Sequence, residues 1–232
     1  MKPTWQTSDG GVRMYLGDCL EVMPMLLDQG EAMILDPPYG IAHKTRYGAS
    51  WRSMQLAGGG DTEIRDTMVS RCELYAMPWA CFGSWNVPTP PQARAVLAWD
   101  RGPAIGVGDP SLPWEPSWDE IAIGGRGWKG SRDEGVIRGH VVATPRTKGR
   151  CHPHEKPVSL IQYLLGKLPL RTICDPTMGI GTTGVACVRT SRRFLGVESD
   201  ERYFAIAVRR VSSELSRAPL FERPIIQREF SH

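Results

Sequence analysis

The feature that most constrains the fold lies late in the chain, in RTICDPTMGIGTTGVACVRTSRRFLGVESDERYFAIAVRRV, residues 171–211. A short apolar run, a glycine-rich loop, an amphipathic stretch, a second apolar run and a second amphipathic stretch follow one another. This order predicts strand, loop, helix, strand and helix, the repeating unit of a parallel sheet covered by helices. We therefore expect an α/β protein with a mostly parallel sheet and helices on both faces.

The remaining chain adds further predicted strands and helices. Strands are predicted over 12–16, 32–35 and 79–85, and helices over 20–27 (with Pro24 in the first turn), 61–77, 89–99 and 157–168. Between about 98 and 145 only short antiparallel edge strands are expected, over 120–125 and 140–144.

Composition sets the broad class of the protein. The 232 residues, 41% of them hydrophobic, suffice for one domain with a sizeable core. The N-terminus lacks the apolar stretch of a secretion signal, no apolar run is long enough for a bilayer, and the six cysteines form no CxxC pair. We expect a cytoplasmic protein with reduced thiols, while a net charge of +3 neither favours nor excludes nucleic acid.

The loop GIGTTG (179–184) fits the GxGxxG pattern of dinucleotide-binding proteins. However, Asp175 precedes the loop, and a carboxylate there would repel a pyrophosphate and attract a cation. Only about fifty residues follow the loop, too few for the second half of a dinucleotide-binding sheet. With Glu198 placed to hold ribose hydroxyls, the pattern favours an adenosine ligand without phosphate, S-adenosylmethionine, over a nicotinamide cofactor or a glycine turn without ligand.

A second motif, ILDPPY (34–39), ends a predicted strand with a carboxylate, two rigid prolines and an aromatic residue. Alone, it also fits a strand that two prolines terminate. Together, ILDPPYG and DPTMGIGTT resemble the amino-group DNA methyltransferases, in the permuted motif order often called the β class. In that order the DPPY half comes first and the cofactor loop last, as here, and the resemblance covers roughly 12–97 and 140–211.

The resemblance implies a Rossmann-like, S-adenosylmethionine-dependent methyltransferase fold in a single domain over residues 1–232. It would comprise a catalytic half (about 12–97), a short DNA-recognition region (about 98–150) and a cofactor half (about 151–215). HPHEKPVSLIQYLL (152–165) is similar to the family's helix that walls the methionine end of the pocket. The implied cofactor-binding residues are Asp18, Asp36, Lys156, Asp175, Thr177, Gly179, Gly181, Thr182, Thr183 and Glu198, with Thr177 standing where the family usually has a bulky aromatic residue.

The implied catalytic residues are Asp36, Pro37, Pro38 and Tyr39. The exocyclic amine of a base is a poor nucleophile because its lone pair is delocalised into the ring. Asp36 and the Pro37 carbonyl can each accept one N–H of the amine, and Tyr39 can stack on the base. Because the amine is unreachable inside a stacked duplex, base flipping is implied.

Two basic stretches are candidates for contacts with double-stranded DNA. Residues 40–60 contain no acid, and residues 126–150 hold seven Lys or Arg against two acids. Such residues position a duplex by its phosphates without reading sequence, or form a solvated charged surface. The candidate DNA-binding residues are His43, Lys44, Arg46, Tyr47, Arg52, Arg126, Lys129, Arg132 and Arg138.

Several alternatives remain open from sequence. Adenine N6 is favoured as the target because N4-cytosine enzymes more often carry Ser at the position of Asp36. Further alternatives are an enzyme that methylates RNA or a protein amide, and a binding protein without catalytic activity. CHPHE (151–155) lacks the paired ligand spacing of zinc sites, so no metal is expected. RTSRR (189–193) is expected to finish a helix. The short recognition region predicts a brief or relaxed target sequence, or a homodimer that shares its recognition.

Overall fold

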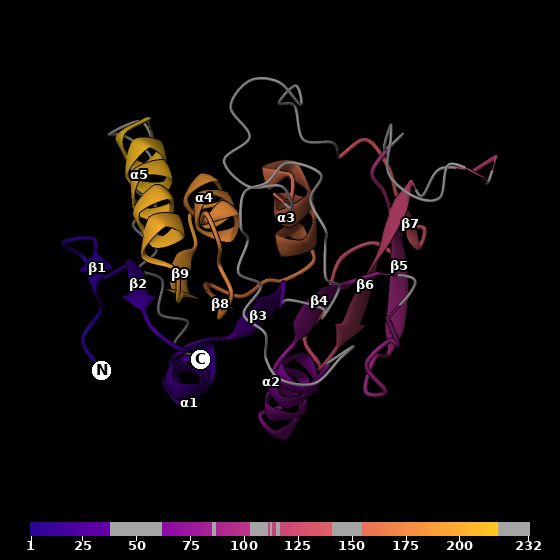
Figure 1. Ribbon diagram of the computed structural model, residues 1–232, viewed down its shortest axis with the longest axis horizontal. Helices are drawn as coiled ribbons and strands as arrows, with labels where there is room; N and C mark the ends of the chain where they lie inside the picture. Colours follow the sequence, from indigo (N-terminus) through magenta and orange to yellow (C-terminus); the bar gives the residue numbers. More distant parts are fainter. Residues whose placement is uncertain are drawn as a thin grey trace, which may run out of the picture.

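A computed structural model describes residues 1–37, 62–84, 87–102, 111, 113–114, 117–140 and 155–217. Within these residues the strands form one sheet of nine, in the order β1-β2-β9-β8-β3-β4-β6-β5-β7. The strands are β1 (Trp5–Gln6), β2 (Val12–Leu16), β3 (Ala32–Leu35), β4 (Trp79–Gly83), β5 (Ala95–Asp100), β6 (Trp118–Gly124), β7 (Val136–Ile137), β8 (Thr172–Asp175) and β9 (Arg193–Glu198). Figure 1 shows this sheet between two layers of helices.

The helices cover both faces of the sheet, as the sequence predicts. They are α1 (Cys19–Gln29), α2 (Glu63–Leu74), α3 (Val158–Gly166), α4 (Thr182–Arg189) and α5 (Glu201–Arg217). α3, α4 and α5 lie on one face, and α1 and α2 lie on the other (Figure 1). Each face buries its own apolar cluster, one centred on Ile34, Phe82 and Phe194, the other on Met33, Trp79 and Leu195.

The five central strands are parallel, which confirms the predicted α/β class. β2, β9, β8, β3 and β4 run in one direction, whereas β6 is antiparallel to β4 and β5 is antiparallel to β6. The chain passes from β8 through α4 to β9 on one side, and from β3 through α2 to β4 on the other. The strand order therefore reverses between β3 and β8, and in such sheets ligands bind beyond the carboxyl ends of the strands at this point.

The expected helix over 89–99 is wrong, because its apolar end belongs to β5 and no part of it is helical. Ala95–Asp100 pair residue by residue with β6, and Arg94 donates its N–H to the Ile123 carbonyl before the strand begins. The apolar run is short enough for either structure, and pairing with β6 decides for a strand. β6 confirms the strand predicted over 120–125, while most of the one predicted over 140–144 lies outside the described residues.

Pro24 lies inside α1, in its second turn, and not in the first turn as predicted. Proline has no N–H to donate to the carbonyl four residues earlier, that of Leu20. Nη1 of Arg71, from α2, donates to this carbonyl at 3.0 Å. The side chain of a neighbouring helix thus satisfies the acceptor that the proline leaves open.

The prediction that RTSRR finishes a helix holds for Arg189, the cation in the last turn of α4, and is wrong for Arg192 and Arg193. α4 ends at Arg189, and Arg193 already belongs to β9. The Arg192 guanidinium instead donates to the carbonyls of Leu165 and Leu168, at 2.8 and 3.0 Å, at the end of α3. A cation near a helix C-terminus is favourable, but the helix it serves is α3.

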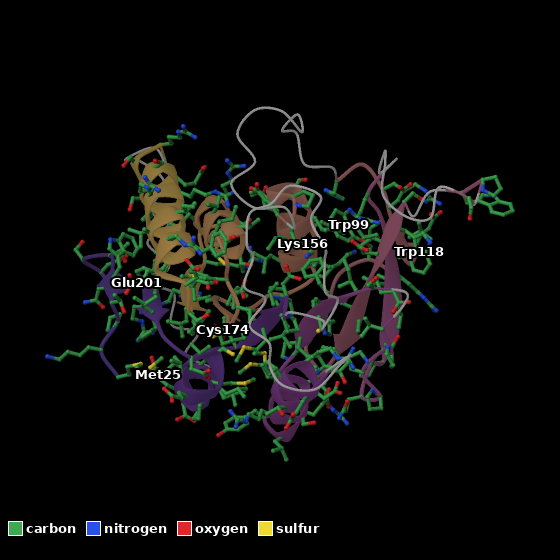
Figure 2. All side chains as sticks on the ribbon, in the orientation of Figure 1. Met25, Trp99, Trp118, Lys156, Cys174 and Glu201 are labelled. Carbon is green, nitrogen blue, oxygen red and sulfur yellow. The ribbon has the colours of Figure 1, made fainter. Side chains whose placement is uncertain are left out.

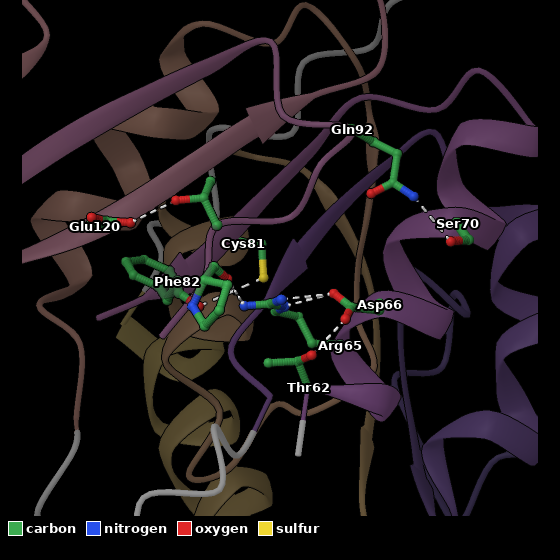
Figure 3. A network of polar contacts seen from close by, with 10 residues as sticks. Thr62, Arg65, Asp66, Ser70, Cys81, Phe82, Gln92 and Glu120 are labelled. Carbon is green, nitrogen blue, oxygen red and sulfur yellow. Dashed lines mark hydrogen bonds and ion pairs between the residues drawn. The ribbon is translucent and has the colours of Figure 1, made fainter. Parts of the chain in front are cut away.

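A buried arginine fixes α2 against the carboxyl end of β4. Arg65, 4% exposed, donates to Asp66 in the same helix and to the Pro88 carbonyl beyond the strand (Figure 3). Thr62 also donates to Asp66, at 2.6 Å. These bonds satisfy the buried charge and hold the start of α2 at the same edge of the sheet as the end of β3. No helix in the described part of the chain is long and apolar enough to cross a membrane.

Candidate active site at the carboxyl edge of the sheet

Two Asp-Pro sequences meet where the strand order reverses. Ala32 and Met33 of β3 lie beside Ile173 and Cys174 of β8 in parallel register, so both strands end at the same edge. Asp175 is the last residue of β8, and Asp36 follows the last residue of β3. The two motifs singled out from the sequence, 139 positions apart by their numbers, therefore form one site.

Asp36 is half-buried and paired with a cation. Nζ of Lys156 lies 2.8 Å from one carboxylate oxygen and 2.7 Å from the other. The Asp36 side chain is 27% exposed and the Lys156 side chain 12% exposed, so the carboxylate faces solvent more than its partner does. Lys156 is predicted to contact a cofactor, and its observed partner is Asp36, the predicted catalytic carboxylate.

An aromatic wall supports this ion pair. The Lys156 ammonium lies 4.9 Å from the centre of the Phe82 ring, and Phe82 packs edge-to-face against Trp99. A cation over a ring face is stabilised by the ring quadrupole. Figure 2 places Lys156 and Trp99 on the α3 side of the sheet. Pro157, with φ −62°, is the N-cap of α3, and a residue before proline is restricted to extended backbone, which limits where Lys156 can reach.

Thr177 joins the two motifs directly. Its hydroxyl accepts a hydrogen bond from the Asp36 backbone N–H at 3.2 Å, and its own N–H donates to Oδ1 of Asp175 at 3.0 Å. An aromatic side chain at this position could not accept the first bond. Thr177, where the resemblance predicts a bulky aromatic residue, therefore links the predicted catalytic and cofactor segments.

Asp175 is buried among neutral donors. Its second oxygen accepts from the Thr183 hydroxyl at 2.6 Å. Burial raises the pKa of Asp175 to about 7 against these two hydrogen bonds, and the carboxylates of Asp36 and Glu198 add to the rise. A buried carboxylate with such a pKa would be stabilised by a ligand that brings positive charge.

The glycine loop begins α4 and has two different sides. Gly181, with φ +79°, is the N-cap of α4, and a Cβ there would lie 2.9 Å from the Cβ of Ala207 in α5. Gly179, with φ +54°, has no atom within 4 Å of the place of its Cβ. One glycine thus permits close packing of the loop on α5, and the other leaves room beside the loop. Thr182, the first residue of α4, is buried like Thr183.

Glu198 and Asp18 lie at the ends of the next two strands. Leu16 pairs with Glu198, and the Gly17 N–H donates to the Glu198 carbonyl at 3.0 Å. Burial raises the pKa of Glu198, although backbone N–H groups, including that of Asp200 at 2.8 Å, oppose the rise. Oδ1 of Asp18 caps α1 by accepting from the N–H groups of Leu20 and Glu21.

Two ion pairs at the site have no recognisable signal in the sequence. Arg210 of α5 donates to the Ile180 carbonyl in the glycine loop at 2.9 Å and to Glu155 at 2.6 Å, which ties the loop to the residue before Lys156. Asp119, in β6, pairs with Arg101 at 3.1 Å. Burial raises the pKa of Asp119, the charges of Arg101 and Lys156 oppose the rise, and Asp36 adds to it.

The predicted DNA-binding residues that the structure describes do not all lie at the same edge of the sheet. Arg126 and Lys129 follow β6, whose end pairs with the start of β4, and the Lys129 N–H bonds to the Lys167 carbonyl beyond the end of α3. They lie at the edge opposite the site. Arg138 follows β7, which runs parallel to β5, so it lies at the edge of the site, with its side chain 62% exposed and paired with Glu134.

Arg132 is exposed and follows Ser131, whose carbonyl accepts from Lys167 near the end of α3. Other predicted residues lie outside the described part of the chain, namely Pro38, Tyr39, His43, Lys44, Arg46, Tyr47 and Arg52, together with Cys151, His152 and His154 of the sequence considered for zinc.

Comparison with known proteins finds similarity to DNA methylases. A family model described as DNA methylase, N6_N4_Mtase, matches residues 119–209. The protein YubD of Escherichia coli (strain K12), named as a methylase, is 26% identical over 231 residues, which cover 87% of this chain and 90% of that protein. These matches support an N6/N4 DNA methyltransferase.

Solved structures of DNA methyltransferases share the fold of this chain. The crystal structure of the M1.HpyAVI–SAM complex is 19% identical, covers 86% of this chain and 99% of its own, and superposes with a TM-score of 0.59. The cytosine-N4-specific PvuII DNA methyltransferase is 15% identical, covers 93% and 94%, and gives a TM-score of 0.55. The chain therefore has the mostly parallel, Rossmann-like fold of S-adenosylmethionine-dependent DNA methyltransferases, as predicted.

Proposed function

We propose that this methylase transfers a methyl group to the N6 amine of an adenine flipped out of double-stranded DNA. The observation that carries the proposal is the position of Asp36, which Thr177 ties to the cofactor segment. This bond holds a carboxylate acceptor for the amine next to the end of β8, where Asp175 is buried without a cation among its described partners.

The residues at the ends of β8 and β9 suit S-adenosylmethionine, the cofactor of N6/N4 DNA methyltransferases. The open side of the loop at Gly179 leaves space for a ligand, and Asp175 and Glu198 are carboxylates suited to a cationic group and to ribose hydroxyls. When bound, the cofactor supplies a methyl group on an electrophilic sulfonium. Asp18 keeps its second carboxylate oxygen outside the helix cap, so it can contact the adenine edge.

Asp36 and its neighbours prepare the amine for attack. Asp36 accepts one N–H of the amine and the Pro37 carbonyl accepts the other, which draws the nitrogen towards tetrahedral geometry and localises its lone pair. Each of these residues precedes a proline and is therefore restricted to extended backbone, so the acceptors are held in place before the base arrives. The nitrogen forms a bond to the methyl carbon as the carbon–sulfur bond breaks, and one amine proton leaves to solvent.

The base must leave the duplex to reach Asp36, and Tyr39 is proposed to stack on it. Stacking on an aromatic side chain contributes about 1–3 kcal/mol per base, which offsets much of the cost of unstacking. Arg138, at the edge of the site, and the basic residues between 40 and 60 are proposed to contact the phosphates. DNA affinity should accordingly fall as salt concentration rises.

Cytosine N4 is the second candidate target. Its amine presents the same two donors to Asp36, and the cytosine-N4-specific PvuII enzyme shares the fold. Adenine is preferred because Asp, and not Ser, precedes Pro-Pro-Tyr in this chain.

The decisive experiment is expression in a bacterial host that lacks its own DNA methylation, followed by single-molecule sequencing of the host DNA. N6-methyladenine in a fixed short sequence is expected, and it should be absent with Asp36→Ala. Detection of N4-methylcytosine instead would show that cytosine, the second candidate, is the target. DNA without modified bases would overturn the proposal.

A further inference from the structure

The ammonium of Lys156 is held directly beside the acceptor that the reaction needs. It contacts both oxygens of Asp36, at 2.7 and 2.8 Å, and lies over the Phe82 ring. An ammonium has three N–H donors, and the contacts to Asp36 use at most two of them. At the carboxyl edge of β3, a hydrogen-bond acceptor and a hydrogen-bond donor therefore stand side by side.

The same pairing, with opposite polarity, is found on the Watson–Crick edge of the two amino bases. Adenine presents its N6 amine, a donor, next to N1, an acceptor, and cytosine presents its N4 amine next to N3. Enzymes read a flipped base through this edge. If the amine donates to Asp36, the neighbouring ring nitrogen comes to the side on which Lys156 stands.

We propose that Lys156 is a specificity-determining residue that donates a hydrogen bond to the ring nitrogen next to the target amine. This inference rests on the proposed function and holds for adenine or cytosine. It gives Lys156 a contact with the base, in addition to or in place of the cofactor contact expected from the family.

The pair would also reject the other two bases. Guanine and thymine present a carbonyl next to an N–H, so the carbonyl oxygen would face Asp36 and the N–H would face the ammonium. Each contact would then be repulsive and would leave desolvated polar groups unpaired. A site that hydrogen-bonds one pattern of polar groups discriminates strongly against a ligand that cannot complete it.

A second consequence is the choice of the nitrogen that is methylated. The ring-nitrogen lone pair lies in the plane of the base and is not delocalised into the ring, so it is the better nucleophile in the free base. A hydrogen bond from Lys156 occupies that lone pair and leaves the amine, shaped by Asp36, to attack the methyl group.

The chain contains a matched control at the other end of the same helix. Lys167, the C-cap of α3, pairs with the carboxylate of Asp133, and its ammonium lies 5.7 Å from the centre of the Tyr163 ring. Lys156 and Lys167 thus share a carboxylate partner and a neighbouring aromatic ring, but Lys167 lies at the edge opposite the site. Lys167→Met removes the same chemistry without reaching the base.

The test combines enzyme variants with base analogues in single-turnover assays at saturating S-adenosylmethionine. Duplexes carry the mapped target sequence with adenine or 1-deazaadenine, or with cytosine or 3-deazacytosine if cytosine is the target. Wild type and Lys167→Met should lose about 10- to 100-fold in methylation rate on the deaza base, as for one hydrogen bond to a charged group. Lys156→Met should be slower by a similar factor on the natural base and show little further loss on the analogue.

A deaza effect of equal size in wild type and Lys156→Met would overturn the proposal. So would a Lys156→Met variant that differs only in its KM for S-adenosylmethionine, since the ammonium would then bind the cofactor alone. Lys156→Arg keeps a cationic donor and should recover part of the rate and of the deaza effect. If wild type methylates no amino base, the proposed function itself fails, an outcome separate from all of these.

Digested product from Lys156→Met gives an independent measurement. Mass spectrometry should detect N1-methyladenine or 3-methylcytosine beside the amine product, because the ring nitrogen is no longer occupied. Amine-methylated product alone, at an undiminished rate, would contradict the assignment.

Discussion

Asp36 and Asp175 both lie at the carboxyl ends of adjacent parallel strands, yet their surroundings are opposite. Both are followed by proline, and both lie at the carboxyl edge where the strand order reverses. Asp36 is partly exposed and carries its own cation, Lys156. Asp175 is 3% exposed, and its hydrogen-bond partners in the described chain are the neutral donors of Thr183 and Thr177.

The difference indicates which ligand each carboxylate is suited to meet. A carboxylate already paired with an ammonium gains little from another cation, but it retains lone pairs for the N–H groups of a neutral amine. A buried carboxylate without a cation has a raised pKa and gains most when a positive ligand arrives. We infer that one strand end handles the neutral nucleophile and the other the charged methyl donor.

The largest expected effect comes from Asp36→Ala, which should lower the rate of methyl transfer by roughly 10³-fold, in the range for loss of a positioned catalytic group. S-adenosylmethionine affinity, measured by calorimetry, should change little because Asp175 is intact. Asp36→Asn keeps one oxygen acceptor and should be less impaired than Asp36→Ala. Lost cofactor affinity with retained turnover would reverse the assigned roles of the two carboxylates.

Asp175→Asn tests the other strand end. The Asn oxygen can still accept from the Thr177 N–H, and the Thr183 hydroxyl can accept from the amide, so the fold should be retained. Without the charge, S-adenosylmethionine affinity at pH 8 should fall about 10- to 100-fold, in line with the loss of a charged hydrogen-bond partner. Affinity unchanged by the substitution would contradict a role for Asp175 in attracting the cation.

The same variant makes a prediction about stability and pH. The pKa of Asp175 rises from 3.8 to about 7 on folding, so between these values the folded protein holds a proton that the unfolded chain has released. The stability contributed by this group is complete below pH 3.8 and is lost as pH approaches 7, by up to about 1.4 kcal/mol per pH unit. Urea unfolding across this range should show that slope in wild type, and Asp175→Asn should lack it.

Sequence could predict both strand ends because each is encoded locally, in DPPY and in DPTMGIGTT. The partners that distinguish them are encoded far away. Lys156 is 120 positions from Asp36, and Glu155 is 55 positions from Arg210. Asp119 lies in a strand segment that looks ordinary in the sequence. It comes under the influence of the charges of Lys156 and Asp36 only when β6 pairs with β4. The helix expected over 89–99 failed for the same reason, because its short apolar run is decided by the neighbouring strand.

The loop glycines sharpen the description of the cofactor side. Gly181→Ala would place a methyl group against Ala207 in left-handed backbone and should lower the free energy of unfolding by about 2–4 kcal/mol. Gly179→Ala also meets left-handed backbone but open space, so its cost should be about 1 kcal/mol. Its methyl group enters the expected ligand space, and S-adenosylmethionine affinity should fall about tenfold. Equal effects of the two variants on both quantities would contradict the two-sided loop.

The smallest effect is expected at the link between the two carboxylates. Thr177→Val preserves shape but removes the acceptor of the Asp36 N–H, while its own N–H can still donate to Asp175. A neutral hydrogen bond of 3.2 Å is worth about 0.5–1.5 kcal/mol, so kcat should fall roughly 2- to 10-fold. Because the lost bond belongs to Asp36, S-adenosylmethionine affinity should remain near that of wild type. Thr177→Ser restores the hydroxyl and should recover kcat, whereas a serine variant as slow as valine would show that the methyl group, and not the hydrogen bond, couples the two strand ends.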